Sequence, residues 1–289
     1  MKEIVKEKIA SLLSGDEEIQ SVEQLGGMTN QNYLVKTSLN LYIVKFFGKG
    51  TDKLIDRQNE KFNLELLKDL KLDVENYLFD IEAGIKVNQY IENAETLDSA
   101  TIKTKFEKIA PILQTIHASG KELKGEFAPF EEIKKYESLI QGEISYPNYE
   151  AVRKSVLSLK NELEKIGVDN KSCHIDLVPE NFIEGPDGHL YLIDWEYSSM
   201  NDPMWDLAAL FLESEFTPEE ETDFLAYYEG DKTPVSREKI RIYKILQDII
   251  WGLWTIYKEE NGADFGDYGI TRYNRAVKEL QSQGGIDED

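Results

Sequence analysis

A short polar motif followed by an acidic strand end constrains this chain more than any other feature. Residues 174–181 read His-Ile-Asp-Leu-Val-Pro-Glu-Asn, which matches the pattern H-x-D-L-x-x-x-N. Asp194 lies 18 residues after Asp176, at the end of a largely apolar segment (190–193) that we expect to be a strand. Phosphoryl transfer needs an Asp that accepts a hydroxyl proton and oxygen ligands for Mg²⁺. The sequence therefore predicts catalytic roles for Asp176, Asn181 and Asp194, of which Asn181 and Asp194 would hold Mg²⁺.

An alternative interpretation makes these polar residues ordinary turn residues. Asp and Asn are common in turns, and Gly-Pro-Asp-Gly at residues 185–188 is itself a turn sequence. The order of loop, hairpin and acidic strand end favours the catalytic interpretation.

Charge and composition exclude several classes of protein. The 289 residues include 33 basic and 55 acidic side chains, a net charge of −22, which disfavours nucleic acid and anionic membranes and attracts cationic ligands. No apolar run reaches the length of a membrane span, and the N-terminus lacks the apolar core of a signal peptide. Cys173 is the only cysteine, which excludes an intrachain disulfide. We expect a cytoplasmic protein with no nucleic-acid or membrane partner.

The first third of the chain has the pattern of a small antiparallel sheet with one central helix. Alternating and β-branched runs predict strands, and longer amphipathic runs predict helices. A helix is expected at 3–13, strands at 19–25, 32–37 and 41–47, a helix at 54–70, and strands at 77–79 and 85–91.

The rest of the chain is predicted to be mostly helical. Helices are expected at 101–118, 130–141, 149–166, 203–214, 218–229, 236–259 and 270–282, with the motif hairpins between 172 and 194. The pattern predicts an α+β, bilobal, protein-kinase-like fold with a small antiparallel β N-lobe and a larger helical C-lobe. We place the nucleotide-binding N-lobe at 1–91 and the C-lobe, with the catalytic and acceptor sites, at 92–289. The chain would cross between them near residues 89–93.

A glycine turn between the first two predicted strands is a candidate phosphate-binding loop. Gly26 and Gly27 can adopt backbone angles closed to other residues, so main-chain N–H groups can approach a phosphate. Thr29 and Asn30 offer further donors. Because Gly-Gly turns between strands are common, this signal is weak by itself.

Lys45 strengthens the prediction of a nucleotide site. It lies in an apolar strand, so its ammonium needs a partner, and Glu60 on the following helix is the expected one. Such a pair would direct the ammonium at the phosphates of ATP. The alternative is an exposed Lys and a solvated Glu. Three residues that end the last strand of the N-lobe would bind the adenine edge through their backbone: Gln89, Tyr90 and Ile91.

We expect the other chemically reactive side chains to take part in packing or capping and not in catalysis. His174 is expected to pack and orient the loop, and Cys173 to be buried packing. Asp206 would accept backbone donors at the start of a helix. We expect His117 and His189 to be incidental, because neither has partners at metal-ligand spacing.

Five segments together resemble the choline/ethanolamine kinases, which are related to the aminoglycoside phosphotransferases. The matching segments are 26–30 (Gly-Gly-Met-Thr-Asn), 174–181, 193–197 (Ile-Asp-Trp-Glu-Tyr), 251–254 (Trp-Gly-Leu-Trp) and 265–268 (Phe-Gly-Asp-Tyr). The likeness spans residues 20–280 and looks closest to bacterial choline kinases that supply phosphocholine for surface polysaccharides. No binding role is assigned between residues 95 and 170.

The resemblance implies a role for each matched residue. Asp176 would be the base, next to the choline hydroxyl, while Asn181 and Asp194 would hold Mg²⁺. The walls of the choline pocket and the acidic residues beside it would be Trp195, Glu196, Tyr197, Glu213, Trp251 and Trp254.

The chemistry of choline agrees with an aromatic pocket. Its trimethylammonium group has no N–H donor, so aromatic faces and diffuse negative charge recognise it. Trp251 and Trp254 are three residues apart, on one face of a predicted helix. Core packing of both indoles is the alternative.

The expected function is ATP- and Mg²⁺-dependent phosphorylation of choline. Two alternatives remain open. The chain could act on another small amino alcohol or on an aminoglycoside, or it could be a non-catalytic sensor of choline or nucleotide.

Overall fold

The structure is a computed structural model that describes residues 2–26, 30–48, 50–230 and 234–282. The chain forms two compact units. Unit 1 comprises Met1–Ile112 and Pro179–Tyr197, and unit 2 comprises Leu113–Val178 and Ser198–Asp289. The motif is therefore divided: Asp176 belongs to unit 2, whereas Asn181 and Asp194 belong to unit 1. The assignment of roles to residues 1–91 and 92–289 stays a prediction.

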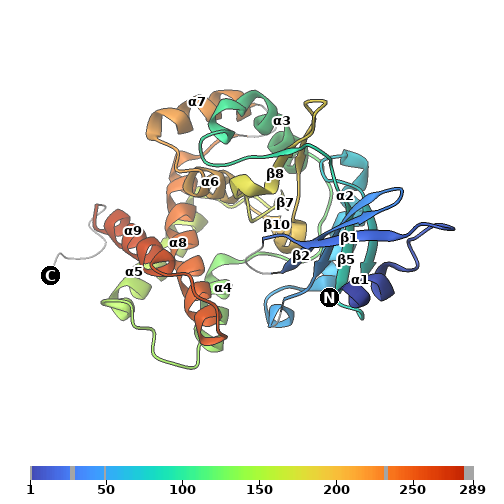
Figure 1. Ribbon diagram of the computed structural model, residues 1–289. Helices are drawn as coiled ribbons and strands as arrows, with labels where there is room; N and C mark the ends of the chain where they lie inside the picture. Colours follow the sequence, from blue (N-terminus) through green and yellow to red (C-terminus); the bar gives the residue numbers. More distant parts are fainter. Residues whose placement is uncertain (1, 27–29, 49, 231–233, 283–289) are drawn as a thin grey trace. The chain divides into compact units, whose positions relative to one another are not determined.

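Unit 1 contains a five-stranded antiparallel sheet with the order β1-β2-β3-β5-β4 (Figure 1). Its strands are β1 (Ile19–Gln24), β2 (Gln31–Thr37), β3 (Leu41–Phe46), β4 (Asn76–Asp80) and β5 (Ile85–Gln89). Because strand side chains alternate between faces, the apolar positions gather on one side. Helix α1 (Lys2–Ile9) covers that side, and its Val5 and Ile9 pack in a core with Val44 and Val87. The predicted order of strands and helices in this part is confirmed.

The opposite face of the sheet is charged. Lys45 on β3 lies directly across from Lys86 on β5, so both side chains leave the sheet on the same side. Helix α2 (Arg57–Leu67) supplies acidic and basic partners to that side. Asp56 caps α2 by accepting the N–H groups of Gln58 and Asn59.

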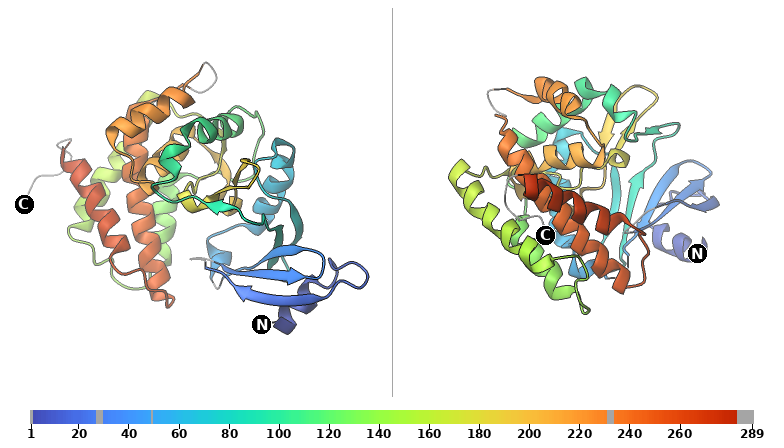
Figure 2. Two further views of the ribbon diagram at one scale, coloured as in Figure 1. Left: turned by 45° about the horizontal axis from the view of Figure 1, so that its top comes forward. Right: turned by 90° about the vertical axis from the view of Figure 1, so that its left-hand side faces the viewer.

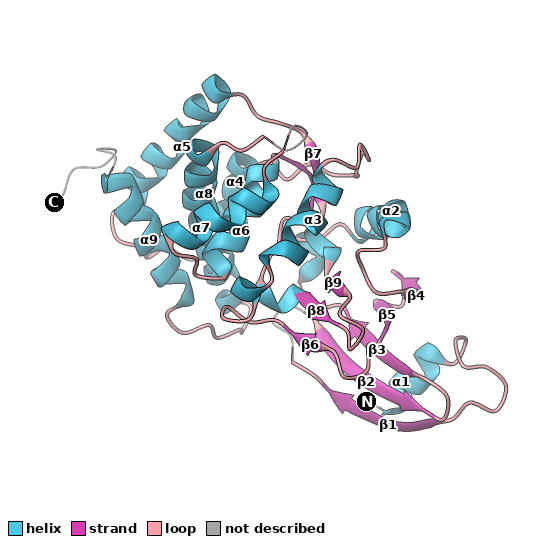
Figure 3. Cartoon of the chain, turned by 90° about the horizontal axis from the view of Figure 1, so that it is seen from above, coloured by secondary structure: helices cyan, strands magenta, loops and turns pink. Residues whose placement is uncertain are grey.

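A second, three-stranded sheet carries the acidic end of the motif (Figure 3). It contains β6 (Glu95–Thr96), β8 (Phe182–Glu184) and β9 (Leu190–Leu192). The β8–β9 hairpin is the predicted one, and the short 3₁₀ helices η4 (Pro179–Asn181) and η5 (Trp195–Tyr197) flank it. Strand β6, which pairs with β8, is too short to have a sequence pattern of its own.

Unit 2 is built around one long buried helix. The helices of this part are α3 (Phe106–His117), which begins in unit 1, α4 (Pro129–Leu139), α5 (Tyr149–Ile166), α6 (Pro203–Glu213), α7 (Pro218–Tyr228), α8 (Arg237–Glu260) and α9 (Tyr268–Ser282). Helix α8 packs against α4, α5, α6 and α9 (Figure 2). A short antiparallel pair, β7 (Lys171–Cys173) and β10 (Ser199–Asn201), leads into the catalytic loop. None of the helices in the described ranges is both long and apolar enough to span a membrane.

Candidate active site

The backbone of the catalytic loop is fastened to helix α6. Asp206, in the first turn of α6, accepts the N–H of His174 on Oδ2 and the N–H of Ile175 on Oδ1, both at 2.8 Å. Its side chain is fully buried. The predicted structural role of Asp206 is confirmed. The next residue of the loop, Asp176, is half-buried.

Ile175 adopts a strained conformation that is held from two sides. Its φ of 78° is a left-handed value that a β-branched side chain rarely adopts. Asp206 fixes its N–H, and the indole N–H of Trp205 donates to its carbonyl at 3.0 Å. Strained residues persist where surrounding contacts over-determine them, often at functional sites. The strain lies immediately before the candidate base Asp176.

His117 is not incidental, and that prediction was wrong. Its Nε2 lies 2.9 Å from Asp206 Oδ2, and its Nδ1 lies 2.7 Å from the hydroxyl of Tyr228. All three side chains are buried. The partners are 89 and 111 residues away in the sequence, so no local pattern could have revealed them.

Among the described residues, one group of side chains has metal-ligand chemistry and close spacing: His117, Cys173 and Asp206. The His and Asp atoms already hydrogen-bond to each other and to the loop. Burial raises the pKa of the Cys173 thiol well above its usual value, which keeps it protonated. We interpret the group as structural, which agrees with the predicted packing role of Cys173.

In unit 1, Lys45 pairs with Asp194 instead of Glu60. The distance from Lys45 Nζ to Asp194 Oδ1 is 2.6 Å. Burial alone lowers the pKa of Lys45, but the carboxylates of Asp194 and Glu196 raise it overall, so the ammonium stays charged. The predicted partner was wrong because Lys86, opposite Lys45 in the sheet, takes Glu60 Oε1 at 3.0 Å.

A buried cluster of charges surrounds Arg57 on α2. Its Nη1 donates to Glu60 Oε2 at 2.6 Å and to Glu196 Oε2 at 2.9 Å. Asn30 joins the cluster, since its Nδ2 donates to Glu196 Oε2 at 2.8 Å and its Oδ1 accepts from Arg57 Nη2 at 3.2 Å. The guanidinium also lies 4.1 Å from the centroid of the Phe47 ring. Arg57 thus links α2 to the segment that follows Asp194.

The cluster separates the pKa values of its two glutamates. Burial raises the pKa of Glu60, but Lys86 and Arg57 outweigh it, so that pKa is lowered overall. Burial together with the Asp194 charge raises the pKa of Glu196. Removal of a cation from the cluster should therefore destabilise the ionised form of Glu196 most, because burial and the charge of Asp194 already disfavour that form.

The structure describes some of the other residues predicted to bind nucleotide. Gly27 and Thr29 lie outside the described residues. The N–H of Gln89 donates to the carbonyl of Glu75 at 2.8 Å, so this group is engaged in the sheet. Tyr90 and Ile91 follow the end of β5, and their role at an adenine edge stays a prediction.

Asn181 and Asp194 are held together by the β8–β9 hairpin. The N–H of Ile193 donates to the carbonyl of Asn181 at 2.8 Å, which brings the two segments together at the base of the hairpin. Asp194 has a φ of 68°, another left-handed value. A carboxylate and an amide oxygen are hard donors, so this pair fits Mg²⁺.

The two tryptophans of α8 form an edge-to-face pair in unit 2. The ring centroids of Trp251 and Trp254 are 6.5 Å apart at 87°. The Trp254 ring also lies at a tilt against Phe265, and Trp251 lies 6.3 Å from Phe127. Both indoles are more than nine-tenths buried. Trp195 is buried in unit 1, where its indole N–H donates to the carbonyl of Leu192 at 2.8 Å.

A charged group in unit 2 connects Glu213 on α6 with α9. Arg272 forms an ion pair with Glu213 and donates to the Tyr268 hydroxyl at 2.7 Å. Burial raises the pKa of Tyr268 to about 12, and the charges of Glu213 and Asp176 both raise it while Arg272 lowers it. Tyr268 therefore lies within electrostatic reach of both carboxylates. The segment 265–268 contributed to the family resemblance, but Tyr268 was not among the residues that the sequence predicted to form the site.

Replacing Lys45 with alanine should weaken ATP affinity or turnover and leave the fold intact. The ammonium lies in contact with the candidate metal ligand Asp194, where the phosphates would bind. Lys45→Arg should also be impaired, because a planar guanidinium does not substitute for a compact ammonium. Steady-state kinetics with varied ATP measure the effect, and Lys36→Ala, an exposed lysine on β2, is the matched control. Wild-type ATP kinetics in Lys45→Ala would refute the assignment.

Comparison with known proteins places the chain in a family. The sequence model of the choline/ethanolamine kinase family matches residues 22–239. The Haemophilus influenzae protein LicA is 31% identical over 269 residues, covering 89% of this chain and 79% of that protein.

Solved structures confirm the predicted fold class. The crystal structure of choline kinase LicA from Streptococcus pneumoniae is 76% identical, with a TM-score of 0.95 over 98% of this chain and 99% of that one. A structure of LicA in complex with AMP, also 76% identical, gives a TM-score of 0.92 and covers 97% and 98%. A spectinomycin phosphotransferase structure, 16% identical with a TM-score of 0.62 over 97% of this chain and 98% of that one, shares the fold alone.

Proposed function

Because the chain belongs to the choline/ethanolamine kinase family, we propose that it transfers the γ-phosphoryl group of ATP to the hydroxyl of choline. The products are phosphocholine and ADP. The observation that carries the proposal is the near-complete similarity to the choline kinase of Streptococcus pneumoniae. The AMP complex of LicA supports a nucleotide as the second substrate.

Asp176 is the group that accepts the hydroxyl proton. It is half-buried, and the preceding backbone is fixed by Asp206 and Trp205, so its position is defined before substrate arrives. A positioned carboxylate of this kind makes the hydroxyl oxygen a better nucleophile as the proton leaves.

Asn181 and Asp194 are the residues that would hold Mg²⁺. The ion, when bound, neutralises the negative charge of the phosphates. Lys45 supplies a second positive charge beside Asp194, and its raised pKa keeps it protonated at neutral pH. The glycine turn with Gly27 and Thr29 is proposed to contact phosphate through N–H donors, whereas the side-chain amide of Asn30, predicted to do the same, donates to Glu196 instead.

Trp251 and Trp254 are proposed to recognise the trimethylammonium group, with Glu213 of the same unit adding negative charge. Glu196, which the sequence also suggested for this role, is instead paired with Arg57 and Asn30 in unit 1. An aromatic surface suits a cation that has no N–H to donate. The charge of Glu213 is shared with Arg272, which tempers its attraction for a second cation.

Loss of one indole should weaken choline binding without affecting ATP. A cation over an aromatic face contributes about 0.5 kcal/mol when exposed and about 2 kcal/mol when desolvated. Trp251→Ala and Trp254→Ala should therefore each raise the KM for choline by roughly two- to thirty-fold at ~1.4 kcal/mol per decade. Phe216→Ala, a buried aromatic that stacks on Phe211, controls for general loosening of unit 2.

The alternative within the family is ethanolamine, because the matching family model covers kinases of both substrates. A primary ammonium needs hydrogen-bond acceptors and gains less from aromatic faces. Release of ADP measured over a panel of choline, ethanolamine and aminoglycosides tests the proposal. Turnover with choline supports it, and turnover with none of the panel would favour a non-catalytic sensor. A cytoplasmic location and the lack of nucleic-acid partners remain predictions.

A further inference from the structure

A buried arginine on α9 engages the acidic side of the proposed choline site. Nη1 of Arg272 donates to Oε1 of Glu213 and, at 2.7 Å, to the hydroxyl of Tyr268. Its Nε lies 3.2 Å from Oδ1 of Asp248 on α8. The side chain is only 3% exposed, so solvent ions screen these contacts little. Arg272 thus connects α6, α8 and α9 through a fixed positive charge.

Arg272 lies close to the aromatic pair and to the candidate base. Its partner Asp248 is three residues before Trp251 on α8, so these two side chains lie on one face of the helix. Burial raises the pKa of Tyr268, the other partner, and the charge of Asp176 adds to the shift. All of these residues belong to unit 2. The guanidinium therefore borders the proposed acceptor site.

The two candidate substrates differ in what they need from Glu213. A primary ammonium has three N–H donors and loses their hydration on binding, so it needs acceptors in return. A trimethylammonium has no such donor and gains from aromatic faces and diffuse negative charge. Once a guanidinium has taken one oxygen of a carboxylate and part of its charge, the primary ammonium loses more than the trimethylammonium does.

We propose that Arg272 is a specificity-determining residue, which favours choline over ethanolamine by occupying the acceptors, Glu213 and Tyr268, that a primary ammonium would use. The proposal rests on the kinase function proposed for this chain and names a residue that selects between the two substrates of the family. Specificity is a difference of two affinities, so a group that weakens the competitor is as effective as one that strengthens the substrate. The aromatic pair attracts choline, and Arg272 rejects ethanolamine.

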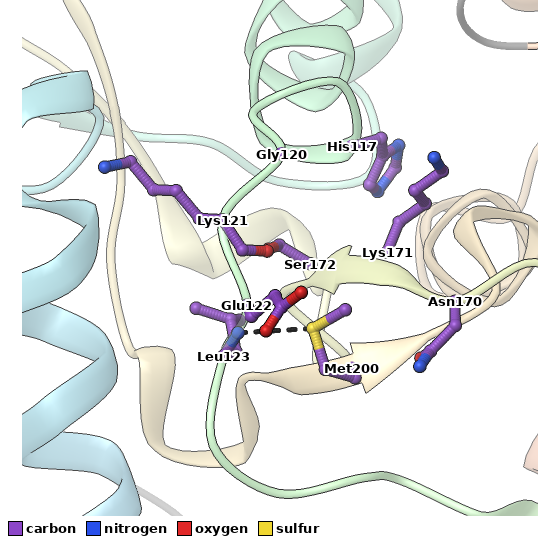
Figure 4. A pocket seen from close by; sticks show the side chains of 9 residues that line it. All are labelled: His117, Gly120, Lys121, Glu122, Leu123, Asn170, Lys171, Ser172 and Met200. Atoms are coloured by element: carbon purple, nitrogen blue, oxygen red, sulfur yellow. Dashed lines mark hydrogen bonds between the residues drawn. The ribbon is translucent and has the colours of Figure 1, made fainter.

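A cavity elsewhere in unit 2 has the wrong chemistry for either cation. It has a volume of about 500 Å³ and lies at the end of α3, where Lys121 and Lys171 contribute to its lining (Figure 4). Among the described residues that line it, Glu122 is the one carboxylate, and none is a Trp, Tyr or Phe. A lining with two ammonium groups and no such aromatic face does not suit a cation. We therefore assign substrate selection to the region of α8 and α9.

Arg272→Met removes the charge and the donors while keeping an extended side chain. Asp248 retains Arg275 through two bonds of 2.6 Å, so Glu213 is the carboxylate that loses its cation. Because Glu213 is half-buried, a ligand can still reach it. We expect the ratio of kcat/KM for choline to that for ethanolamine to fall roughly ten- to a hundred-fold, since the primary ammonium gains a charged acceptor.

A graded series of substrates measures this effect. ADP release is followed with ethanolamine, its N-methyl and N,N-dimethyl derivatives, and choline, which differ in the number of N–H donors. In the wild type, kcat/KM should rise with each added methyl group. In Arg272→Met the rise should flatten, because the substrates with more donors gain most from the released carboxylate.

Three further variants separate this role from helix packing. Arg275→Met is the matched control: Arg275 shares Asp248 and, in the part of the chain that the structure describes, donates to neither Glu213 nor Tyr268. It should keep the wild-type preference. Arg272→Gln, which loses the charge and keeps a polar side chain, should lower the preference in the same direction and serves if the methionine variant does not fold. Adding Glu213→Gln to Arg272→Met should restore part of the preference, whereas loosened packing would not recover.

Calorimetric titration with choline and with ethanolamine tests the proposal independently of phosphoryl transfer. If the wild type binds choline more tightly and Arg272→Met narrows the difference, but no amino alcohol is phosphorylated, the proposed function fails and the specificity role stands. If choline is phosphorylated and the ratio is the same in the wild type, Arg272→Met and Arg275→Met, the function stands and the proposal is overturned. An equal loss for both substrates in Arg272→Met would also overturn it, because it would show a structural role.

Discussion

Replacing Asp176 with asparagine is expected to lower kcat by ~10²–10⁴-fold, the usual contribution of a positioned base. The substitution keeps the size of the side chain but removes its negative charge and its ability to accept a proton. Because the proposed metal ligands, Asn181 and Asp194, are elsewhere in the chain, binding of Mg·ATP should stay near wild type. Steady-state kinetics and nucleotide titration together measure the two effects.

The matched comparison for this result is Asp194→Asn. Asp194 is proposed to hold Mg²⁺, so its replacement should weaken metal and nucleotide binding as well as turnover. The pair thus distinguishes a base from a ligand. Equal activity of wild type and Asp176→Asn at saturating substrate would show that Asp176 is not the base.

Arg57→Ala is expected to lower the free energy of unfolding substantially. Arg57 is 7% exposed and pairs with Glu60 and Glu196, which are themselves buried. Removing one partner from a buried ion pair typically costs about 3–5 kcal/mol, because the remaining charge is left uncompensated. Lys86 still neutralises Glu60, so Glu196 should be the more affected carboxylate. Thermal unfolding, followed by a probe in unit 1, measures the loss.

A second substitution identifies the cause of that loss. Glu196→Gln in the Arg57→Ala background removes the uncompensated charge and should recover part of the stability. Arg237→Ala, an exposed arginine at the start of α8, should leave the unfolding temperature unchanged. If Arg57→Ala is as stable as the Arg237→Ala control, the cluster contributes little to the fold.

Periodicity in the sequence was sufficient to predict most elements of the fold. Helix α5 begins at Tyr149 and ends at Ile166, as its amphipathic run indicates, and the alternation in β3 places Val44 and Lys45 on opposite faces. These periodic patterns are properties of short segments, so one sequence is enough to predict them. The two-residue β6 has no such pattern and depends on its pairing with β8.

The partners of buried side chains were harder to predict from the sequence, because they depend on strand register. Lys45 was recognised as a buried cation, but Glu60 was assigned to it by proximity along the chain. The register of β3 with β5 brings a second cation, Lys86, to the same face, and this lysine pairs with Glu60. Lys86 could have been suspected from its position in an apolar strand. His117 could not, since it meets Asp206 only after both helices have packed.

The substrate specificity of the aromatic pair tests the central claim most directly. The measurement is kcat/KM for choline and for ethanolamine, in the wild type and in Trp254→Ala, with one ADP-release assay. We predict that the wild type prefers choline, and that the preference falls when the indole is removed, because a trimethylammonium gains more from an aromatic face than a strongly hydrated primary ammonium does. A wild type that prefers ethanolamine, or a preference that survives removal of both Trp251 and Trp254, would contradict this account of choline recognition.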